Sequence, residues 1–76
     1  MTDYLLDVRY TLCPIPVIRT QERVADLEPG DCLRVIATDP GTLADVPAWC
    51  RVHGHKVLET EEASGEVMIL VEVCGD

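Results

Sequence analysis

The chain has 76 residues, which suits one small domain spanning residues 1–76 and excludes a second. Apolar residues make up 47% of it and charged residues 26%, a composition that argues against disorder. Fourteen acidic against six basic residues give a net charge of −8, which would repel nucleic acid, so we expect no direct binding to it. No apolar run approaches the roughly 20 residues that span a bilayer, and the first residues do not have the pattern of a signal peptide. We therefore expect a monomeric cytoplasmic protein with reduced thiols and no membrane partner.

The first half of the chain predicts a strand, a helix and a second strand. Residues 4–8 are a short apolar-rich run typical of a strand. Pro14 and Pro16 exclude a strand interior and suit the start of a helix, whose apolar residues recur at near-helical spacing over residues 17–27. A turn containing Pro and Gly ends this helix, and a second strand is predicted over residues 32–38.

The second predicted helix has two possible starts. Asp39-Pro40 resembles a cap followed by proline at the first helical position, whereas Pro47 offers either a later start or a kink. Gly54 is a good residue to end the helix. Two further strands are predicted, over residues 56–60 and 67–73, with a turn at residues 63–65 between them.

The predicted order is β-α-β-α-β-β. The simplest packing is an α/β (α+β) two-layer sandwich, in which one four-stranded mixed sheet carries both helices on one face. Right-handed crossovers would make the first two strands parallel, and the final hairpin would add an antiparallel pair.

Cys13 lies where the first strand ends and the first helix begins. The unpaired N–H groups and aligned dipoles at a helix start favour a thiolate, by about 0.3–1 kcal/mol when exposed and about 2 kcal/mol when partly buried. We therefore expect the pKa of Cys13 to fall from about 8.5 to about 7.5. Arg9 and Arg19 would lower it further if their side chains reach the sulfur. The alternative is that Cys13 is a small buried hydrophobe.

The residues around Cys13 have predicted supporting roles. Pro14 and Pro16 fix the backbone after the sulfur, and we expect them to stiffen the loop and present Cys13 outward. Asp7 and Arg9 precede the loop and are expected to hold it or an incoming partner. The alternative for Asp7 and Arg9 is ordinary solvation at the end of a strand.

With these motifs the sequence resembles the TusA/SirA family of small sulfur carriers, whose hallmark is Cys-Pro-x-Pro at the start of the first helix. The resemblance spans nearly the whole chain. The segments that carry it, in order, are Leu6-Asp7-Val8-Arg9, Cys13-Pro14-Ile15-Pro16-Val17, Leu27-Glu28-Pro29-Gly30-Asp31, Thr38-Asp39-Pro40-Gly41, Asp45-Val46-Pro47-Ala48-Trp49-Cys50 and Gly54-His55.

The resemblance implies the fold predicted from the pattern of elements, and a function. Cys13 would accept sulfane sulfur as a persulfide from a donor protein, a cysteine desulfurase or a rhodanese, and pass it to an acceptor of the DsrE-like or another type. Such relays serve tRNA thiolation, molybdenum-cofactor metabolism or sulfur oxidation, and no cofactor is implied. One departure is that Tyr10-Thr11-Leu12 lacks the glycine usual in the family, which implies a stiffer or bulkier loop beside the sulfur.

The other cysteines and the histidines allow alternatives that we rank lower. Cys50, His53 and His55 have a spacing open to zinc, but a structural zinc site normally takes four ligands from paired motifs, so core packing of Cys50 is favoured and no metal is predicted. His53 and His55 are expected to cap the end of the helix, where its dipole favours a cation, and a role in proton transfer is the less favoured alternative. Cys32 is expected to be structural, and Cys74 to be exposed, where it would resolve oxidised Cys13 only if the tail folds back.

Two other classes of function remain as alternatives. The chain would be a regulatory or scaffold module if the Cys-Pro-x-Pro loop served only for docking. A thiol oxidoreductase is less favoured, because the chain has no Cys-x-x-Cys motif.

Overall fold

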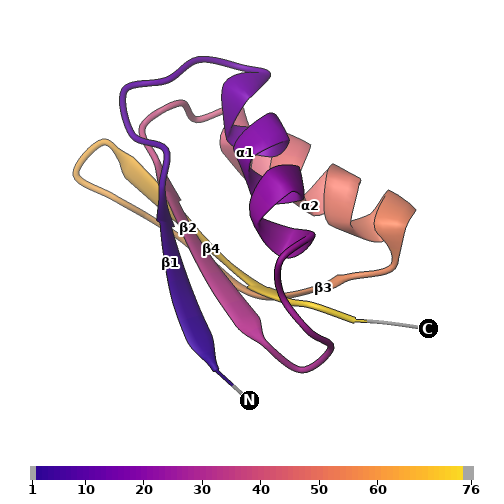
Figure 1. Cartoon of the computed structure of the whole chain (residues 1–76). Helices are drawn as coiled ribbons and strands as arrows, with labels where there is room; N and C mark the ends of the chain where they lie inside the picture. The colour runs from indigo at the N-terminus through magenta and orange to yellow at the C-terminus, as the bar shows by residue number, and fades with distance from the viewer. Residues whose placement is uncertain (1, 75–76) are drawn as a thin grey trace.

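In a computed structural model, which describes residues 2–74, two helices pack against one face of a four-stranded sheet (Figure 1). This is the predicted two-layer sandwich with the predicted order of elements. In chain order the elements are β1 (Asp3–Asp7), α1 (Ile15–Val24), β2 (Cys32–Ala37), α2 (Thr42–His53), β3 (Lys56–Ala63) and β4 (Glu66–Glu72). No helix in this part of the chain is both long enough and apolar enough to cross a membrane.

The sheet is mixed, with strand order β1-β2-β4-β3. β1 pairs with β2 in parallel, with Leu5 opposite Arg34, and β4 pairs antiparallel with both β2 and β3. The prediction that the first two strands are parallel and that the last two form an antiparallel hairpin is therefore confirmed. The position of β4 between β2 and β3 was not predicted, because the sequence patterns of single strands do not indicate their order in a sheet.

The second helix uses the earlier of its two predicted starts. α2 begins at Thr42, shortly after Asp39-Pro40, and continues through Pro47. Proline in a helix interior lacks one N–H donor, but the packed apolar side of α2, which includes buried Val46 and Cys50, keeps the segment helical. As predicted, Gly54 ends the helix, in a left-handed conformation with φ 79°.

The third strand is longer than its sequence predicts. β3 extends to Ala63, through Glu59, Glu61 and Glu62, whose side chains are exposed. Acidic residues are poor strand formers in isolation, but backbone pairing with β4 continues as far as Ala63 opposite Glu66 and holds them extended. The strand lies at the edge of the sheet, where charged side chains discourage pairing with other chains.

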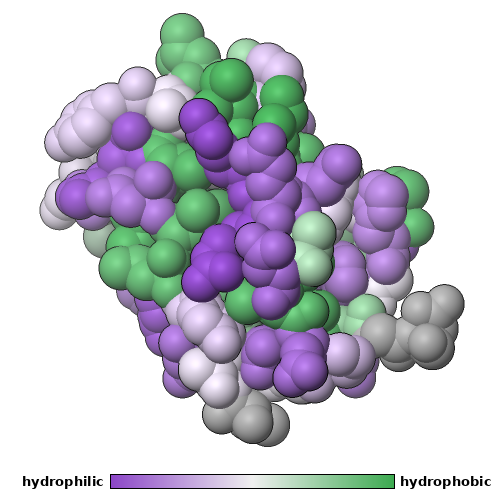
Figure 2. Space-filling model, in the orientation of Figure 1, coloured by the Kyte–Doolittle hydropathy of each residue, from purple (hydrophilic) through white to green (hydrophobic). Residues whose placement is uncertain are grey.

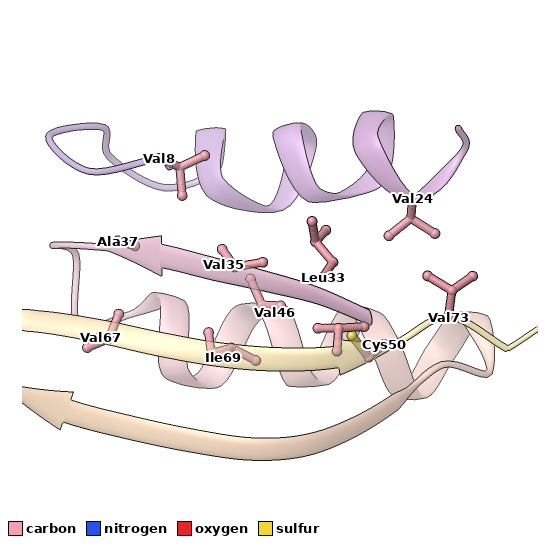
Figure 3. Packing of buried hydrophobic residues seen from close by; sticks show 11 residues of the cluster. Val8, Val24, Leu33, Val35, Ala37, Val46, Cys50, Val67, Ile69 and Val73 are labelled. Carbon is pink, nitrogen blue, oxygen red and sulfur yellow. The ribbon is translucent and has the colours of Figure 1, made fainter. Parts of the chain in front are cut away.

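The core lies between the sheet and the helices and is built from aliphatic residues (Figure 3). Alternate residues of the two central strands point into it, as expected for strands with one covered face. Its buried members are Val8, Val24, Leu33, Val35, Ala37, Val46, Cys50, Val67, Ile69, Val71 and Val73.

The topology fixes where the functional loops lie. Because β1 and β2 are parallel, the loops that follow them lie at the same end of the sheet. The loop containing Cys13 is therefore next to the loop that leads into α2 (Figure 1).

Leu33→Ala should lower the free energy of unfolding by about 2–5 kcal/mol, because Leu33 is fully buried in β2 and truncation leaves a cavity. Urea unfolding followed by circular dichroism measures this loss. The matched control is Leu5→Ala in the neighbouring strand, where the side chain is 61% exposed and little change is expected. Equal losses in the two variants would contradict this placement of the core.

Candidate functional site

Cys13 is an exposed residue of the β1–α1 loop. The loop is anchored to the β2–α2 segment, because the Tyr10 N–H donates to Thr38 Oγ1 at 2.9 Å. Tyr10 has φ +64°, the left-handed region that glycine adopts with least strain. Tyr10 thus holds a backbone conformation typical of glycine in a loop whose three residues before Cys13 include no glycine. The predicted outward presentation of Cys13 agrees with its exposure.

Two carboxylates from the neighbouring loop and helix contact Cys13. Asp39 Oδ2 accepts a hydrogen bond from the Cys13 N–H at 3.0 Å, and its Oδ1 accepts one from the Gly41 N–H at 3.0 Å. Asp45, in the first turn of α2, accepts a hydrogen bond from the Cys13 thiol, with 3.1 Å between Sγ and Oδ2. Gly41 lies close to both, since a Cβ there would be 3.3 Å from Asp39 Oδ1 and 3.8 Å from Asp45 Oδ2. The sulfur therefore faces negative charge.

These carboxylates raise the pKa of Cys13 above the ordinary value for a thiol. The largest cause is the hydrogen bond to Asp45, followed by desolvation and by repulsion from Asp45 and Asp39. The sequence-based expectation of a lowered pKa was wrong. A carboxylate that accepts the S–H hydrogen bond stabilises the protonated form, and its charge disfavours the anion.

The start of α1 provides less stabilisation for a thiolate than its position suggests. Helix starts favour anions through free N–H groups, but Pro14 and Pro16 have none, and the Ile15 N–H donates to the Leu12 carbonyl at 2.9 Å. The first three residues after Cys13 therefore offer no amide to its sulfur. The two prolines that indicate the helix start in the sequence thus also remove N–H groups that would otherwise stabilise a thiolate there.

Arg9 and Arg19, the two cations considered for Cys13, both contact carboxylates instead. The Arg9 guanidinium contacts both carboxylate oxygens of Asp7, at 3.0 and 2.8 Å, and Glu66 at 3.2 Å. Arg19 is paired with Glu22 at 3.4 Å on the exposed side of α1. In this conformation both guanidinium groups contact carboxylates rather than the sulfur, so the condition under which they would lower the pKa of Cys13 is not met.

Asp7 and Arg9 instead tie the end of β1 to the start of β4. The Arg9 guanidinium and backbone N–H both donate to Asp7 and hold the pKa of its carboxyl at about 2. The contact of Arg9 with Glu66 links the loop to a strand 57 residues away in sequence. Asp7 and Arg9 thus hold the base of the Cys13 loop, one of the two roles expected for them.

The remaining cysteines lie away from the Cys13 loop. Cys32 and Cys50 are buried, as expected for structural residues. Cys74 is half-buried rather than exposed, because it follows β4 and packs near His55, whose Nδ1 accepts the Cys74 N–H at 3.0 Å. The antiparallel pairing of β4 with β2 puts Cys74 at the end of the sheet opposite Cys13. This geometry does not bring the two sulfurs together as a redox pair.

The two histidines pack beside Trp49. The ring centroid of His53 lies 4.8 Å from that of Trp49, and the His55 ring stacks at 5.3 Å. Burial lowers the pKa of His55, which favours the neutral ring that accepts the Cys74 N–H. With Cys50 in the core, these contacts account for the Cys-x-x-His-x-His spacing through packing.

Apolar side chains are exposed around Cys13. Tyr10, Leu12, Ile15 and Ile18 are 84%, 75%, 37% and 44% exposed, and we call them the apolar rim. Figure 2 shows hydrophobic surface on the upper part of the molecule, where Figure 1 places this loop and the start of α1. Sequence periodicity did not identify the rim, because Tyr10 and Leu12 lie outside any regular element and Ile18 falls among the apolar residues at helical spacing.

Comparison with known proteins gives the family. Residues 4–73 match the model of the family described as sulfurtransferase TusA. The chain is 39% identical over 74 residues to the sulfur carrier protein TusA of Pseudomonas paraeruginosa, covering 97% of this chain and 94% of that protein. It is 42% identical over 64 residues to YrkF of Bacillus subtilis, covering 84% of this chain but only 34% of that longer protein.

The fold comparison agrees. The structure of a SirA-like protein from Desulfitobacterium hafniense superposes with a TM-score of 0.82 at 23% identity, over 95% of this chain and 99% of that one. The fold is therefore the two-layer sandwich of that SirA-like structure. The chain belongs to the TusA family of sulfur carrier proteins.

The pH dependence of Cys13 alkylation provides a test of its surroundings. Because the folded state raises the thiol pKa, the thiolate fraction at neutral pH falls, and the rate with iodoacetamide should reach half its maximum at a pH above the ordinary thiol value of about 8.5. Peptide mapping by mass spectrometry separates Cys13 from Cys74. The control is the protein unfolded in urea, where the midpoint should return to the ordinary value; a folded midpoint below it would contradict the contact with Asp45.

Proposed function

We propose that the chain carries sulfane sulfur as a persulfide on Cys13 and relays it between proteins in the cytoplasm. Membership of the TusA family is the observation that carries this proposal. It is supported by the exposure of Cys13 and by its place in the Cys13-Pro14-Ile15-Pro16 motif. Pro14 and Pro16 would fix the loop that presents the sulfur.

The chemistry is two sulfur transfers. Cys13 Sγ attacks the terminal sulfur of a donor persulfide, a new S–S bond forms, and the donor's own cysteine sulfur leaves with the electron pair of the old bond. The acceptor's thiolate then attacks the terminal sulfur on Cys13 and regenerates the thiol. No outside oxidant or reductant is needed, because one S–S bond replaces another in each step.

The partners would recognise the surface around Cys13. Exposed aliphatic and aromatic side chains are typical of the centres of protein interfaces, and the apolar rim belongs to the loop that contains Cys13 and to the start of α1. The net charge of −8 favours donors and acceptors with basic surfaces. A cysteine desulfurase or a rhodanese is the proposed donor and a DsrE-like or another thiol protein the proposed acceptor, for tRNA thiolation, cofactor sulfuration or sulfur oxidation.

A regulatory module that docks through this loop without moving sulfur is the second candidate. The observation that favours it is the contact with Asp45, which holds the Cys13 thiol protonated in the free protein. The two candidates differ in whether the sulfur atom itself is needed.

Sulfur loading distinguishes the two candidates. After incubation with a cysteine desulfurase and cysteine, intact mass spectrometry should show one added sulfur atom, removed by a reducing thiol. Cys13→Ser should abolish this addition, and Cys74→Ser, a matched change at the other partly exposed cysteine, should leave it intact. Loading of Cys13→Ser would contradict the assignment, and unloaded wild-type protein would favour the regulatory module.

The apolar rim should matter for protein donors and not for small ones. Leu12→Glu should slow loading from a desulfurase at least tenfold, because it places charge in a docking surface, while loading from glutathione persulfide stays within about twofold. The matched control is Val52→Glu, at an equally exposed apolar residue near the far end of α2, with little expected effect on either donor. Equal slowing with both donors would show damage to the loop rather than to docking.

A further inference from the structure

Sulfur transfer at this site requires that the Cys13 thiol lose its proton. The role inferred for the group that accepts this proton rests on the proposed function. The nucleophile in a sulfur transfer is a thiolate, but the free chain holds Cys13 as a thiol. The charged groups nearest the sulfur are Asp45 on α2 and Asp39 before it, both acidic. On the side of β1 and α1, Arg9 and Arg19 are held by other carboxylates. Neither arginine is placed to stabilise a thiolate in this conformation. The Cys13 thiol therefore needs a group that accepts its proton when it reacts.

Asp45 is the acceptor that the geometry provides. Its Oδ2 lies 3.1 Å from Cys13 Sγ, within the reach of a general base and its proton donor. The residue sits on the first turn of a twelve-residue helix, where the carboxylate is favoured by the helix dipole and its backbone is fixed. We propose that Asp45 is the general base of this site, taking the Cys13 proton as sulfur is accepted and returning it to the departing sulfur of the donor.

Asp39 has a different place in the site. Both of its oxygens already accept backbone N–H groups, one from Cys13 and one from Gly41. It therefore positions the Cys13 backbone against α2 and adds negative charge, but its hydrogen bonds are to amides and not to the thiol. Asp39 is a positioning residue, and Asp45 touches the reacting atom.

The step is balanced in protons and electrons. As the Cys13 sulfur bonds to the terminal sulfur of the donor persulfide, its proton passes along the existing hydrogen bond to Asp45 Oδ2. The donor S–S bond breaks, its electron pair leaves on the donor cysteine sulfur, and that sulfur takes the proton from Asp45. The products are a Cys13 persulfide, a donor thiol and an ionised Asp45. Because the proton moves during bond formation, a free thiolate need not accumulate beside two carboxylates.

This mechanism predicts that removing the Asp45 charge has opposite effects on alkylation and on sulfur transfer. Loss of the Asp45 charge should lower the pKa of Cys13, so Asp45→Asn should react several-fold faster with iodoacetamide at pH 7. The same variant should accept sulfur from glutathione persulfide at least tenfold more slowly, because the proton has lost its acceptor. Asp45→Glu should recover part of the transfer rate. Asp26→Asn, the same charge change at an exposed residue beyond α1, is the matched control and should match wild type in both reactions.

The pH profile gives an independent readout. Wild-type transfer should stay nearly flat around neutral pH, because the reactive form is a thiol beside a carboxylate. Asp45→Asn transfer should rise about tenfold per pH unit up to its thiol pKa, since it depends on the thiolate fraction. Circular dichroism establishes that each variant is folded.

The outcomes are distinguishable. If Asp45→Asn accelerates sulfur transfer in parallel with alkylation, Asp45 only suppresses ionisation and the proposal is overturned. If its transfer rate and pH profile match those of wild type, the proposal is likewise overturned, while the carrier function stands. If wild-type Cys13 takes up no sulfur from either donor, the carrier function itself fails, and with it the part assigned to Asp45.

Discussion

The parallel pairing of β1 with β2 decides which residues surround Cys13. Parallel strands end at the same edge of a sheet, so the β1–α1 loop and the β2–α2 loop are neighbours although 26 residues separate Cys13 from Asp39. The Asp39 carboxylate joins the two loops by accepting backbone N–H groups from both. Asp45 lies in the first turn of α2, just after this junction, and is thereby placed beside Cys13. The chemistry of the site is thus set by topology.

Two opposing electrostatic effects meet at the Cys13 sulfur. A helix start favours an anion, whereas the hydrogen bond that the thiol donates to Asp45 favours the protonated form and is the largest cause of the raised pKa. The direct hydrogen bond from the thiol to Asp45 is therefore the stronger effect, and the missing amides of Pro14 and Pro16 weaken the other one further. The raised pKa lowers the thiolate fraction of this exposed sulfur and so slows its reaction with electrophiles. On the proposed mechanism, the same carboxylate removes the proton when a persulfide is in place.

The surface around the site combines two means of recognition. The apolar rim supplies area that a partner would cover, and the acidic charge of the chain favours basic surfaces over acidic ones. Arg9 is held by Asp7 and Glu66, which fixes the base of the Cys13 loop to two strands of the sheet. The loop therefore presents its sulfur and the apolar rim from a base that is fixed to the sheet.

Local patterns were sufficient for most of the fold. Alternating apolar residues identified β4, helical spacing identified α1, and Gly54 correctly marked the end of α2. The length of β3 and the choice between two starts for α2 were not fixed locally. Backbone pairing with β4 extends β3 through acidic residues that are poor strand formers, and buried Val46 and Cys50 keep α2 helical across Pro47.

For the site, the sequence alone identified the candidate cysteine and the family. The Cys13-Pro14-Ile15-Pro16 motif lies within one segment, so reading it needs no knowledge of distant contacts. Only the tertiary structure decided that Asp45 accepts the thiol hydrogen bond and that Arg9 contacts Glu66. The reason is that hydrogen bonding and ionisation depend on atoms a few ångströms apart in space, and Asp45 reaches Cys13 from 32 residues away through the pairing of β1 with β2.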